Sequence, residues 1–301
     1  MLEVISEYGG LTVLAPAKVN LTLRVLGTRP DGYHVLESVV AGVTLFDTLH
    51  AEPDGDLSLA CRGLEAPAGP DNLILKAARA LGARCGIRAG ARLSLEKRIP
   101  VGRGLGGGSS DAAATLVALN DLWRCGLDPA ELAAVGASVG SDVPLFFGPP
   151  MAVMRGRGED IEPLETRFTW TLVLAWPAYR MPTAEVYAAY DRLGEDGDAK
   201  PSATAILEVL GGPVRDAASF LVNDLERAAD NMRERRFDVR ACLHDAGAQA
   251  VGMTGSGSAY FAVADTEAEA QRWADAAGVA GAETYLVALQ SEGTDQRENS
   301  T

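Results

Sequence analysis

The chain has 301 residues, 47% of them hydrophobic and 23% charged, which is typical of a folded globular protein and excludes a disordered or fibrous one. Its 27 basic and 41 acidic residues give a formal net charge of −14, which argues against nonspecific binding to nucleic acid or to anionic membranes. The 4 cysteines form no C-x-x-C pair, so neither a zinc site nor a disulfide framework is expected.

The first part of the chain reads as strands followed by a helix. Strands are expected over residues 11–27, interrupted at Pro16, then over 33–50 and over 56–61, and a helix over 71–86. From residue 18 polar and apolar residues alternate. Four polar side chains therefore share one strand face, which by pattern alone would point to solvent: Lys18, Asn20, Thr22 and Arg24.

The most informative stretch, residues 97–123, reads K-R-I-P-V-G-R-G-L-G-G-G-S-S-D-A-A-A-T-L-V-A-L-N-D-L-W. A strand pattern over 91–99 precedes it, and apolar residues at helical spacing follow from Ala112, with Ser109 to Asp111 at the expected helix start. Glycine-rich turns can direct backbone N–H groups at an oxyanion, and the positive end of the following helix dipole points to the same place. This stretch therefore predicts a phosphate-binding loop.

Two familiar nucleotide motifs fit less well. Gly102, Gly104 and Gly107 satisfy G-x-G-x-x-G, but a dinucleotide-binding unit needs a strand after the helix. Here Asp128, Pro129 and Glu131 have the pattern of an N-cap, a first helical proline and a capping-box acid, so a second helix is expected instead. No Gly-Lys-Ser/Thr follows the glycines, which excludes a Walker A loop.

The remainder predicts a second domain. A G-S-D-V-P turn at 140–144, a hairpin near 155–158 and a polar segment at 162–167 lead to a strand at 171–176. Helices are expected over 183–193, 214–226, 239–246 and 267–277, and strands near 251, at 260–264 and at 284–289, with a glycine loop at 254–258. This is a ferredoxin-like β–α–β–β–α–β order. The polar tail 291–301 is expected to be disordered.

The string P-x-G-x-G-L-G-G-G-S-S-D-A-A, from Pro100 to Ala113, resembles the ATP loop of the GHMP kinase superfamily. The third glycine, together with A-P-A-K-V-N at 15–20 and R-P-D-G-Y-H at 29–34, resembles the 4-diphosphocytidyl-2-C-methyl-D-erythritol kinases of that superfamily. D-N-L-I at 71, G-S-D-V-P at 140, N-D-L-E at 223 and M-T-G-S-G-S at 253 follow in the family's order.

The resemblance implies an α+β, two-domain fold, with a ribosomal-protein-like ATP-binding domain over 1–162 and a ferredoxin-like substrate domain over 163–290. It implies Lys18 and Asp142 as catalytic residues, Asn20 facing the erythritol, and contacts to the cytidine from Tyr33, His34, Thr183 and Tyr187. It also implies ATP contacts from Asn72, Pro100, Val101, Gly102, Arg103, Gly104, Leu105, Gly106, Gly107, Gly108, Ser109 and Ser110.

The expected activity is ATP-dependent phosphorylation of a small-molecule hydroxyl, with Mg²⁺ as cofactor and the Ser110 hydroxyl as a candidate ligand. Three alternatives stay open: another kinase of the superfamily acting on homoserine, mevalonate or a sugar, a dinucleotide-dependent oxidoreductase, and a nucleic-acid-binding module. No N-terminal basic and apolar signal is visible, so a cytoplasmic location is expected, with small-molecule substrates and neither nucleic acid nor a membrane as partner.

Overall fold

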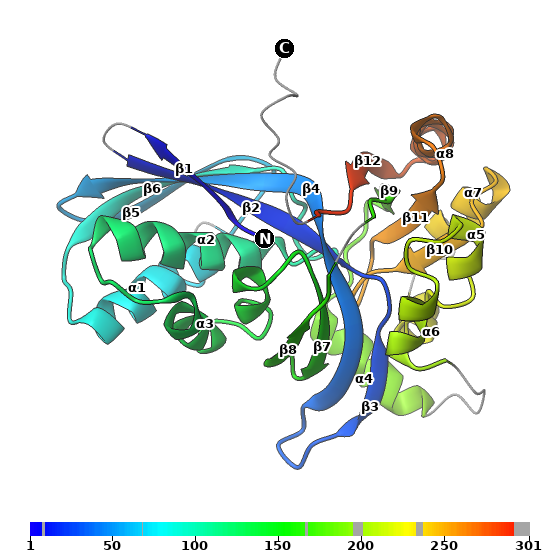
Figure 1. The fold of residues 1–301 in the computed structure, drawn as a ribbon, viewed down its shortest axis with the longest axis horizontal. Coiled ribbons are helices and arrows are strands. Elements are labelled where there is room, and N and C mark those ends of the chain that lie inside the picture. Colours follow the sequence, from blue (N-terminus) through cyan, green and yellow to red (C-terminus); the bar gives the residue numbers. More distant parts are fainter. Residues whose placement is uncertain (8–9, 68, 166–167, 195–200, 233–236, 292–301) are drawn as a thin grey trace.

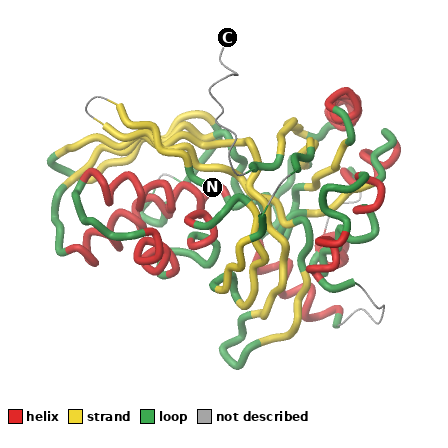
Figure 2. The backbone as a smooth tube through the Cα atoms, in the orientation of Figure 1, coloured by secondary structure: helices red, strands yellow, loops and turns green. Residues whose placement is uncertain are grey.

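A computed structural model describes residues 1–7, 10–67, 69–165, 168–194, 201–232 and 237–291. The chain forms two β-sheets that lie side by side, each with helices packed against it (Figure 1; Figure 2). This is the predicted α+β class. Among the described helices none is long and apolar enough to cross a membrane. The predicted tail lies outside the described residues, apart from Ser291.

The first sheet has 8 strands, with β1-β2-β4-β6-β5 as its main order. β3 and β7 pair with β4, and β8 pairs with β7. The bounds are β1 Glu3–Glu7, β2 Gly10–Asn20, β3 Arg24–Thr28, β4 His34–Asp54, β5 Leu57–Gly63, β6 Gly90–Lys97, β7 Met151–Gly156 and β8 Asp160–Pro163. β2 continues through Pro16, where the register with β4 shifts, because this proline occupies an irregularity in the ladder.

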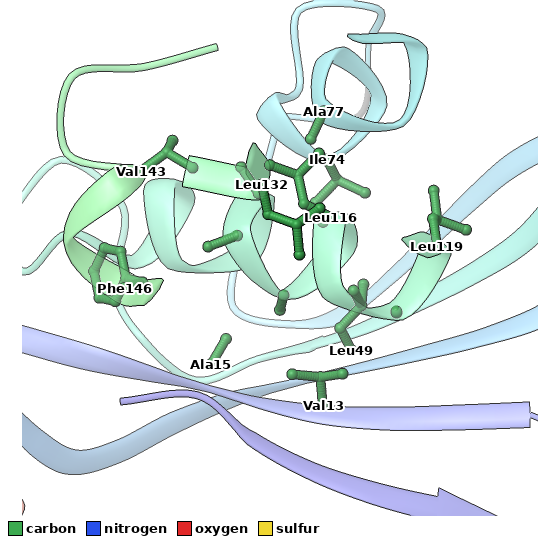
Figure 3. Close-up of a cluster of buried hydrophobic side chains, with 14 of the residues drawn as sticks. Val13, Ala15, Leu49, Ile74, Ala77, Leu116, Leu119, Leu132, Val143 and Phe146 are labelled. Atoms are coloured by element: carbon green, nitrogen blue, oxygen red, sulfur yellow. The ribbon is translucent and has the colours of Figure 1, made fainter. Parts of the chain in front are cut away.

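Helices α1 (Leu73–Cys85), α2 (Gly107–Leu122) and α3 (Pro129–Ala137) cover one face of this sheet (Figure 1). Figure 3 shows apolar side chains of β2 and β4 meeting those of the helices across the main core. α2 is rich in alanine, the strongest helix former, and its small side chains let it lie close to the sheet. This packing fixes the N-terminal end of α2, where the glycine loop enters.

The second sheet has 4 antiparallel strands in the order β10-β11-β9-β12, the order of a ferredoxin-like fold. Its strands are β9 Thr171–Trp176, β10 Ala250–Met253, β11 Tyr260–Ala264 and β12 Glu283–Ala288. The helices of this part are α4 Thr183–Leu193, α5 Val214–Ala217, α6 Glu226–Met232, α7 Val239–Asp245 and α8 Glu267–Ala280, with the 3-10 helix η2 at Ala203–Glu208. The other 3-10 helix, η1 at Pro144–Phe147, belongs to the first half, where it packs against α2 and α3.

The two sheets share a hydrophobic cluster. Apolar residues of β2 and β4, such as Val19 and Ala41, pack with Leu172 and Trp176 of β9 in one continuous buried group. Isolated bridges add backbone ties, one between Leu23 and Asn223 and one between Val43 and Leu289. The site described below lies where these two halves meet. The proposed domain limits at 162 and 163 stay a prediction.

Most predicted elements are confirmed, and four need correction. The strand pair predicted over 11–27 is interrupted after Asn20, where β2 ends, rather than at Pro16. The predicted helix over 214–226 is wrong: α5 ends at Ala217 and α6 begins at Glu226, since Asn223 and Asp224 bond to other segments instead. α2 begins at Gly107, before the predicted serines. The face of Lys18, Asn20 and Thr22 is buried rather than solvated, with exposures of 4%, 2% and 0%.

Candidate active site

The glycine loop joins β6 to α2 as predicted. Gly102, Gly104 and Gly106 all adopt positive φ, of 72°, 79° and 72°, which explains their alternation with other residues. Gly106 is the N-cap of α2, and Ser110 N donates to Gly106 O at 3.0 Å. Within the described residues no side chain caps this helix end. Its free N–H groups and its positive dipole end are therefore available to an anion.

A cleft of ≈ 440 Å³ opens over this loop and extends between the two halves of the chain. Its lining brings together segments that are distant in sequence, from β2, the 140–144 turn, α4 and the second glycine loop at 254–258. The predicted site residues that line it are Lys18, Asn20, Pro100, Val101, Gly102, Arg103, Gly104, Leu105, Gly106, Gly107, Gly108, Ser109, Asp142, Thr183 and Tyr187.

Lys18 and Asn20 lie on β2 beside the loop. Lys18 N donates to Leu105 O at 3.0 Å, which ties the strand to the loop. Lys18 Nζ donates to Asn20 Oδ1 at 2.5 Å, and Asn20 Nδ2 donates to Ser38 Oγ at 2.8 Å, so the amide orientation is fixed from both ends. Burial lowers the pKa of Lys18, and the nearby Asp142 carboxylate partly restores it.

Asp142 could have been only a turn residue, since Val143 N donates to Gly140 O at 3.1 Å and closes a turn around it. A carboxylate in that role accepts a hydrogen bond from a nearby backbone N–H. In the part of the chain that the structure describes, the Asp142 side chain accepts none. It lies instead on the cleft lining, near Lys18 and Tyr187, where its charge can act on a bound molecule.

Of the residues predicted to contact cytidine, His34 and Tyr187 contact each other, whereas Tyr33 and Thr183 have other partners. The His34 ring stacks on Tyr187 with 4.7 Å between centroids, and His34 Nε2 lies 2.7 Å from Asp191 Oδ1. Tyr33 is 53% exposed, with the Arg157 guanidinium 3.8 Å from its ring centroid. Tyr187 and Thr183 line the cleft, whereas Tyr33 and His34 lie beside it rather than on its lining.

Two residues predicted to contact ATP, Asn72 and Ser110, lie outside the cleft lining. Asn72 caps α1, because its Oδ1 accepts from Ile74 N at 2.8 Å and its Nδ2 donates to Pro67 O at 2.6 Å. Ser110 is fully buried in the first turn of α2, and its hydroxyl has no partner among the described residues. Neither lines the cleft, so their contacts with ATP stay predictions.

Beneath the glycine loop lies a charged cluster that the sequence analysis missed. Lys97 Nζ, at the end of β6, donates to Asp47 Oδ2 and to Asp111 Oδ2, the latter at 2.7 Å. Asp47 Oδ1 also accepts from the backbone N of Arg98 at 2.6 Å and of Ile99 at 2.8 Å. The three side chains are at most 5% exposed. The cluster fixes the strand end and the first turn of α2 on either side of the loop.

One lysine faces two carboxyl groups in this cluster, so one proton is retained. Burial, reinforced by the Asp47 carboxylate, raises the pKa of Asp111 to about 8 although Lys97 opposes the shift. The pKa of Lys97 itself is raised; burial alone would lower it, but the two carboxylates prevail. At neutral pH Asp111 is therefore mainly the neutral acid, and its Oδ1 is buried without a partner in the described residues.

We predict that Asp111→Asn removes a pH dependence of stability. Native Asp111 keeps its proton up to about pH 8, whereas the unfolded chain releases it near pH 4. Native stability therefore falls as pH rises between these values, by about 1.4 kcal/mol per pH unit for this group. In urea unfolding from pH 5 to 8, the free energy of unfolding of the variant should rise relative to that of the native chain as the pH increases. Parallel curves would contradict the assignment of the proton.

The second glycine loop and the N-D-L-E motif complete the site. Asn20 N donates to Thr254 Oγ1 at 2.9 Å, and Thr183 Oγ1 lies 2.9 Å from Ser256 Oγ. Asn223 Nδ2 holds the loop by donating to the carbonyl oxygens of Met253 and Gly255, at 2.8 and 2.9 Å. The sequence marked both motifs without giving them a role. Their role here is to close the second half of the chain over β2.

Comparisons with known proteins agree with this site. The family GHMP kinases N terminal domain matches residues 72–148, and GHMP kinases C terminal matches 210–281. The 4-diphosphocytidyl-2-C-methyl-D-erythritol kinase of Pelotomaculum thermopropionicum is 42% identical over 87% of this chain and 92% of its own. The chain belongs to this kinase family. The enzyme of the same name from Methylobacterium radiotolerans is 44% identical over 83% of this chain and 88% of its own.

Solved structures place this kinase chain in the same fold. A crystal structure of 4-(cytidine 5'-diphospho)-2C-methyl-D-erythritol kinase matches with a TM-score of 0.77 and 38% identity, covering 93% of this chain and 99% of its own. Mevalonate kinase from L. major matches with a TM-score of 0.73 at 15% identity, covering 96% and 97%, which reflects the shared fold alone. The dinucleotide-binding alternative fails, since α3 rather than a strand follows α2.

Proposed function

We propose that this protein transfers the γ-phosphoryl group of ATP to the 2-hydroxyl of 4-diphosphocytidyl-2-C-methyl-D-erythritol, a step of the non-mevalonate route to isoprenoid precursors. The observation that carries the proposal is the convergence of Lys18, Asp142 and the glycine loop on one cleft. Phosphoryl transfer needs a phosphate cradle, a positive charge and a group that handles the hydroxyl proton. The cleft offers one of each, and the family relatives carry the corresponding name.

In the proposed reaction the loop amides and the N-terminus of α2 hold the triphosphate. Asp142 orients the substrate hydroxyl and accepts its proton, because its carboxylate accepts no competing hydrogen bond among the described residues. Lys18 stabilises the negative charge on the attacking oxygen and on the phosphoryl group. Asn20 holds the Lys18 ammonium in place through its own fixed amide.

Mg²⁺ fits this arrangement as a phosphate-bound ion. Among the described residues no group of three or more His, Cys, Asp or Glu side chains could hold a metal ion. The Ser110 hydroxyl, buried and without a partner in the same part of the chain, is kept as the candidate protein ligand although it does not line the cleft. Mg²⁺ commonly takes few protein ligands and several phosphate and water oxygens. When bound it would supply positive charge that offsets the negative charge of the phosphates.

Recognition of the cytidyl group is assigned to the stacked rings of His34 and Tyr187, together with Tyr33 and Thr183. Aromatic faces suit a flat pyrimidine ring, and His34 supplies a ring nitrogen within reach of a hydrogen bond. In the described structure that nitrogen contacts Asp191, which is exposed and can release it. Tyr187 stacks on His34 and lies near Asp142 on the cleft lining, so the nucleoside end and the reacting hydroxyl would occupy adjoining parts of one cleft.

We predict that Tyr33→Ala and His34→Ala raise the KM for the cytidyl substrate by about 10-fold or more while the KM for ATP changes little, because one lost stacking contact is worth about 1–3 kcal/mol. Steady-state kinetics with each substrate varied in turn measures this. A suitable control is Tyr285→Ala, since Tyr285 stacks on Trp176 of the second sheet and does not line the cleft. Equal changes in both KM values would point to a general folding role for the two residues.

An ADP-release assay with a panel of acceptors tests the function itself. The panel holds the cytidyl-diphospho methylerythritol, its uridyl analogue, homoserine, mevalonate and galactose. We expect turnover with the cytidyl compound and a preference of at least about 100-fold over the others, because a site that hydrogen-bonds a base edge rejects analogues that lack the match. Preferred turnover of homoserine, mevalonate or galactose would overturn the proposal.

A cytoplasmic location, and small molecules rather than nucleic acid or a membrane as partners, complete the proposal.

A further inference from the structure

Arg103 lies in the middle of the glycine loop, yet its side chain leaves the first half of the chain. Its Nη1 donates to Tyr179 O and, at 2.7 Å, to Ser258 Oγ, and its Nη2 donates to Ala178 O at 3.0 Å. Only 6% of the residue is exposed. A phosphate loop needs only its backbone to hold an anion, so this buried side chain calls for a separate explanation.

Two of the acceptors of Arg103, the carbonyl oxygens of Ala178 and Tyr179, lie just before helix α4. Residues 177–182 connect β9 to α4, whose first residue is Thr183 and whose second turn carries Tyr187. Both side chains line the cleft. Ser258 Oγ, the third acceptor, itself donates to Tyr179 O at 3.0 Å. The guanidinium therefore fixes the start of α4 and the second glycine loop to the phosphate loop at one point.

The backbone of the loop is fixed to the same partners. Ala259 N donates to Arg103 O at 3.3 Å, and Thr254 Oγ1 donates to Gly104 O at 3.2 Å. Gly104 packs so closely on Thr254 that a Cβ there would lie 2.2 Å from the Thr254 carbonyl oxygen. A shift of the phosphate loop must therefore move the second half of the chain, or break these contacts.

Only arginine can make this set of bonds. Its planar guanidinium presents several N–H donors in a fixed fork, whereas a lysine ammonium is a compact point charge. The acceptors of Arg103 within the described residues are neutral oxygens, and hydrogen bonds from a charged donor are the stronger kind. The Arg103 side chain thus joins the phosphate loop to the start of α4 through charge-assisted hydrogen bonds.

We propose that Arg103 is a positioning residue that couples the phosphate loop to α4, so that ATP and the cytidyl substrate each strengthen the binding of the other. This inference rests on the proposed function. Each substrate orders the element that it contacts, and both elements share the bonds of Arg103. The first substrate to bind therefore removes part of the ordering entropy that the second must otherwise overcome.

The test is calorimetric titration of a non-hydrolysable ATP analogue into the full-length protein, with and without saturating cytidyl-diphospho methylerythritol. For the native chain we expect the substrate to tighten analogue binding by about 5-fold or more, the usual lower range of such coupling. Arg103→Met should bring this ratio close to one, and Arg103→Lys should also reduce it, since the charge remains but the fork is lost. Ser258→Ala should reduce it in part, from the opposite side of the contact.

Arg98→Met is the matched control. Its guanidinium is 59% exposed and pairs with Glu96, so the variant removes one positive charge near the loop without touching the second half. It should keep the native ratio. The coupling would be overturned if the native protein bound the ATP analogue equally well with and without the cytidyl substrate. It would also be overturned if Arg103→Met showed the same affinity ratio as the native protein. A purely structural role would weaken both titrations equally and leave the ratio unchanged, which also overturns it. Native protein that does not bind the cytidyl compound at all would instead refute the proposed function.

Discussion

Replacing Asp142 by Asn should lower kcat by about two to four orders of magnitude, the range expected when a proton acceptor is lost. The amide keeps the size and shape of the side chain while its charge and basicity disappear. Affinity for ATP should change little, because in the proposed complex the phosphates bind to the loop rather than to Asp142. Stability should also change little, since no backbone N–H depends on this carboxylate in the described chain. Single-turnover kinetics measures the effect on the chemical step, and calorimetry measures the effect on ATP affinity.

Asp128 provides the matched control for this prediction. It is a true cap, whose Oδ1 accepts from Glu131 N at 2.8 Å in a complete capping box of α3. Asp128→Ala should lower stability by about 1 kcal/mol and leave kcat unchanged. Were Asp142 only a turn residue, its variant would behave like that of Asp128, with reduced stability and normal turnover.

Lys18→Met should lower kcat to a similar degree, because in the proposed mechanism the buried ammonium stabilises the same transition state. The double variant with Asp142→Asn should be little slower than either single one, since groups that act on one transition state lose their effects together. Additive losses would indicate that the two side chains serve separate steps.

The second large effect is expected at Gly104, where Gly104→Ala should lower kcat/KM for ATP by about 100-fold or more. The added methyl group would lie 2.2 Å from Thr254 O, which is backbone and cannot move aside alone. The residue also adopts a φ of 79°, which is unfavourable for alanine. The glycine loop must therefore move away from the second half of the chain, and its N–H groups would no longer point at the proposed phosphate site.

Gly86→Ala separates these two causes. Gly86 caps α1 with a φ of 67°, and no heavy atom lies within 4 Å of the place that an added methyl group would take, so it tests backbone strain alone. We expect it to lose about 1 kcal/mol of stability and to keep its kinetics. If Gly104→Ala matched Gly86→Ala in kinetics, the close contact between the two glycine loops would have no functional weight.

Local patterns predicted most of the fold. The capping box at Asp128 and the glycine run before α2 each carry their signal within a few neighbouring residues, and the structure confirms the elements that they predict. The ferredoxin-like order of the second half was likewise readable, since its strands and helices are separated by clear turn residues.

The features that failed prediction depend on contacts between distant segments. The polar face of β2 looked solvated because nothing local reveals that the loop of Thr254 covers it. In the Lys97 cluster, Lys97 bonds to Asp47, which is 50 residues away in the sequence, and to Asp111, which is 14 residues away. Asp47 lies in a strand whose sequence gives no sign of this contact. The helix predicted through Asn223 was wrong because that amide bonds to the second glycine loop. Tertiary partners decided each case, overriding local propensity.

The central claim is transfer of phosphate to the 2-hydroxyl, and the product's phosphorus NMR spectrum tests it most directly. Carbon 2 of the methylerythritol carries a methyl group and no hydrogen, so a phosphate ester there has no proton three bonds from phosphorus. After turnover with ATP and the cytidyl substrate, the proton-coupled spectrum should show one new phosphomonoester singlet beside an intact diphosphate. A doublet or triplet for the new ester would place the phosphate on a secondary or primary hydroxyl and contradict the account.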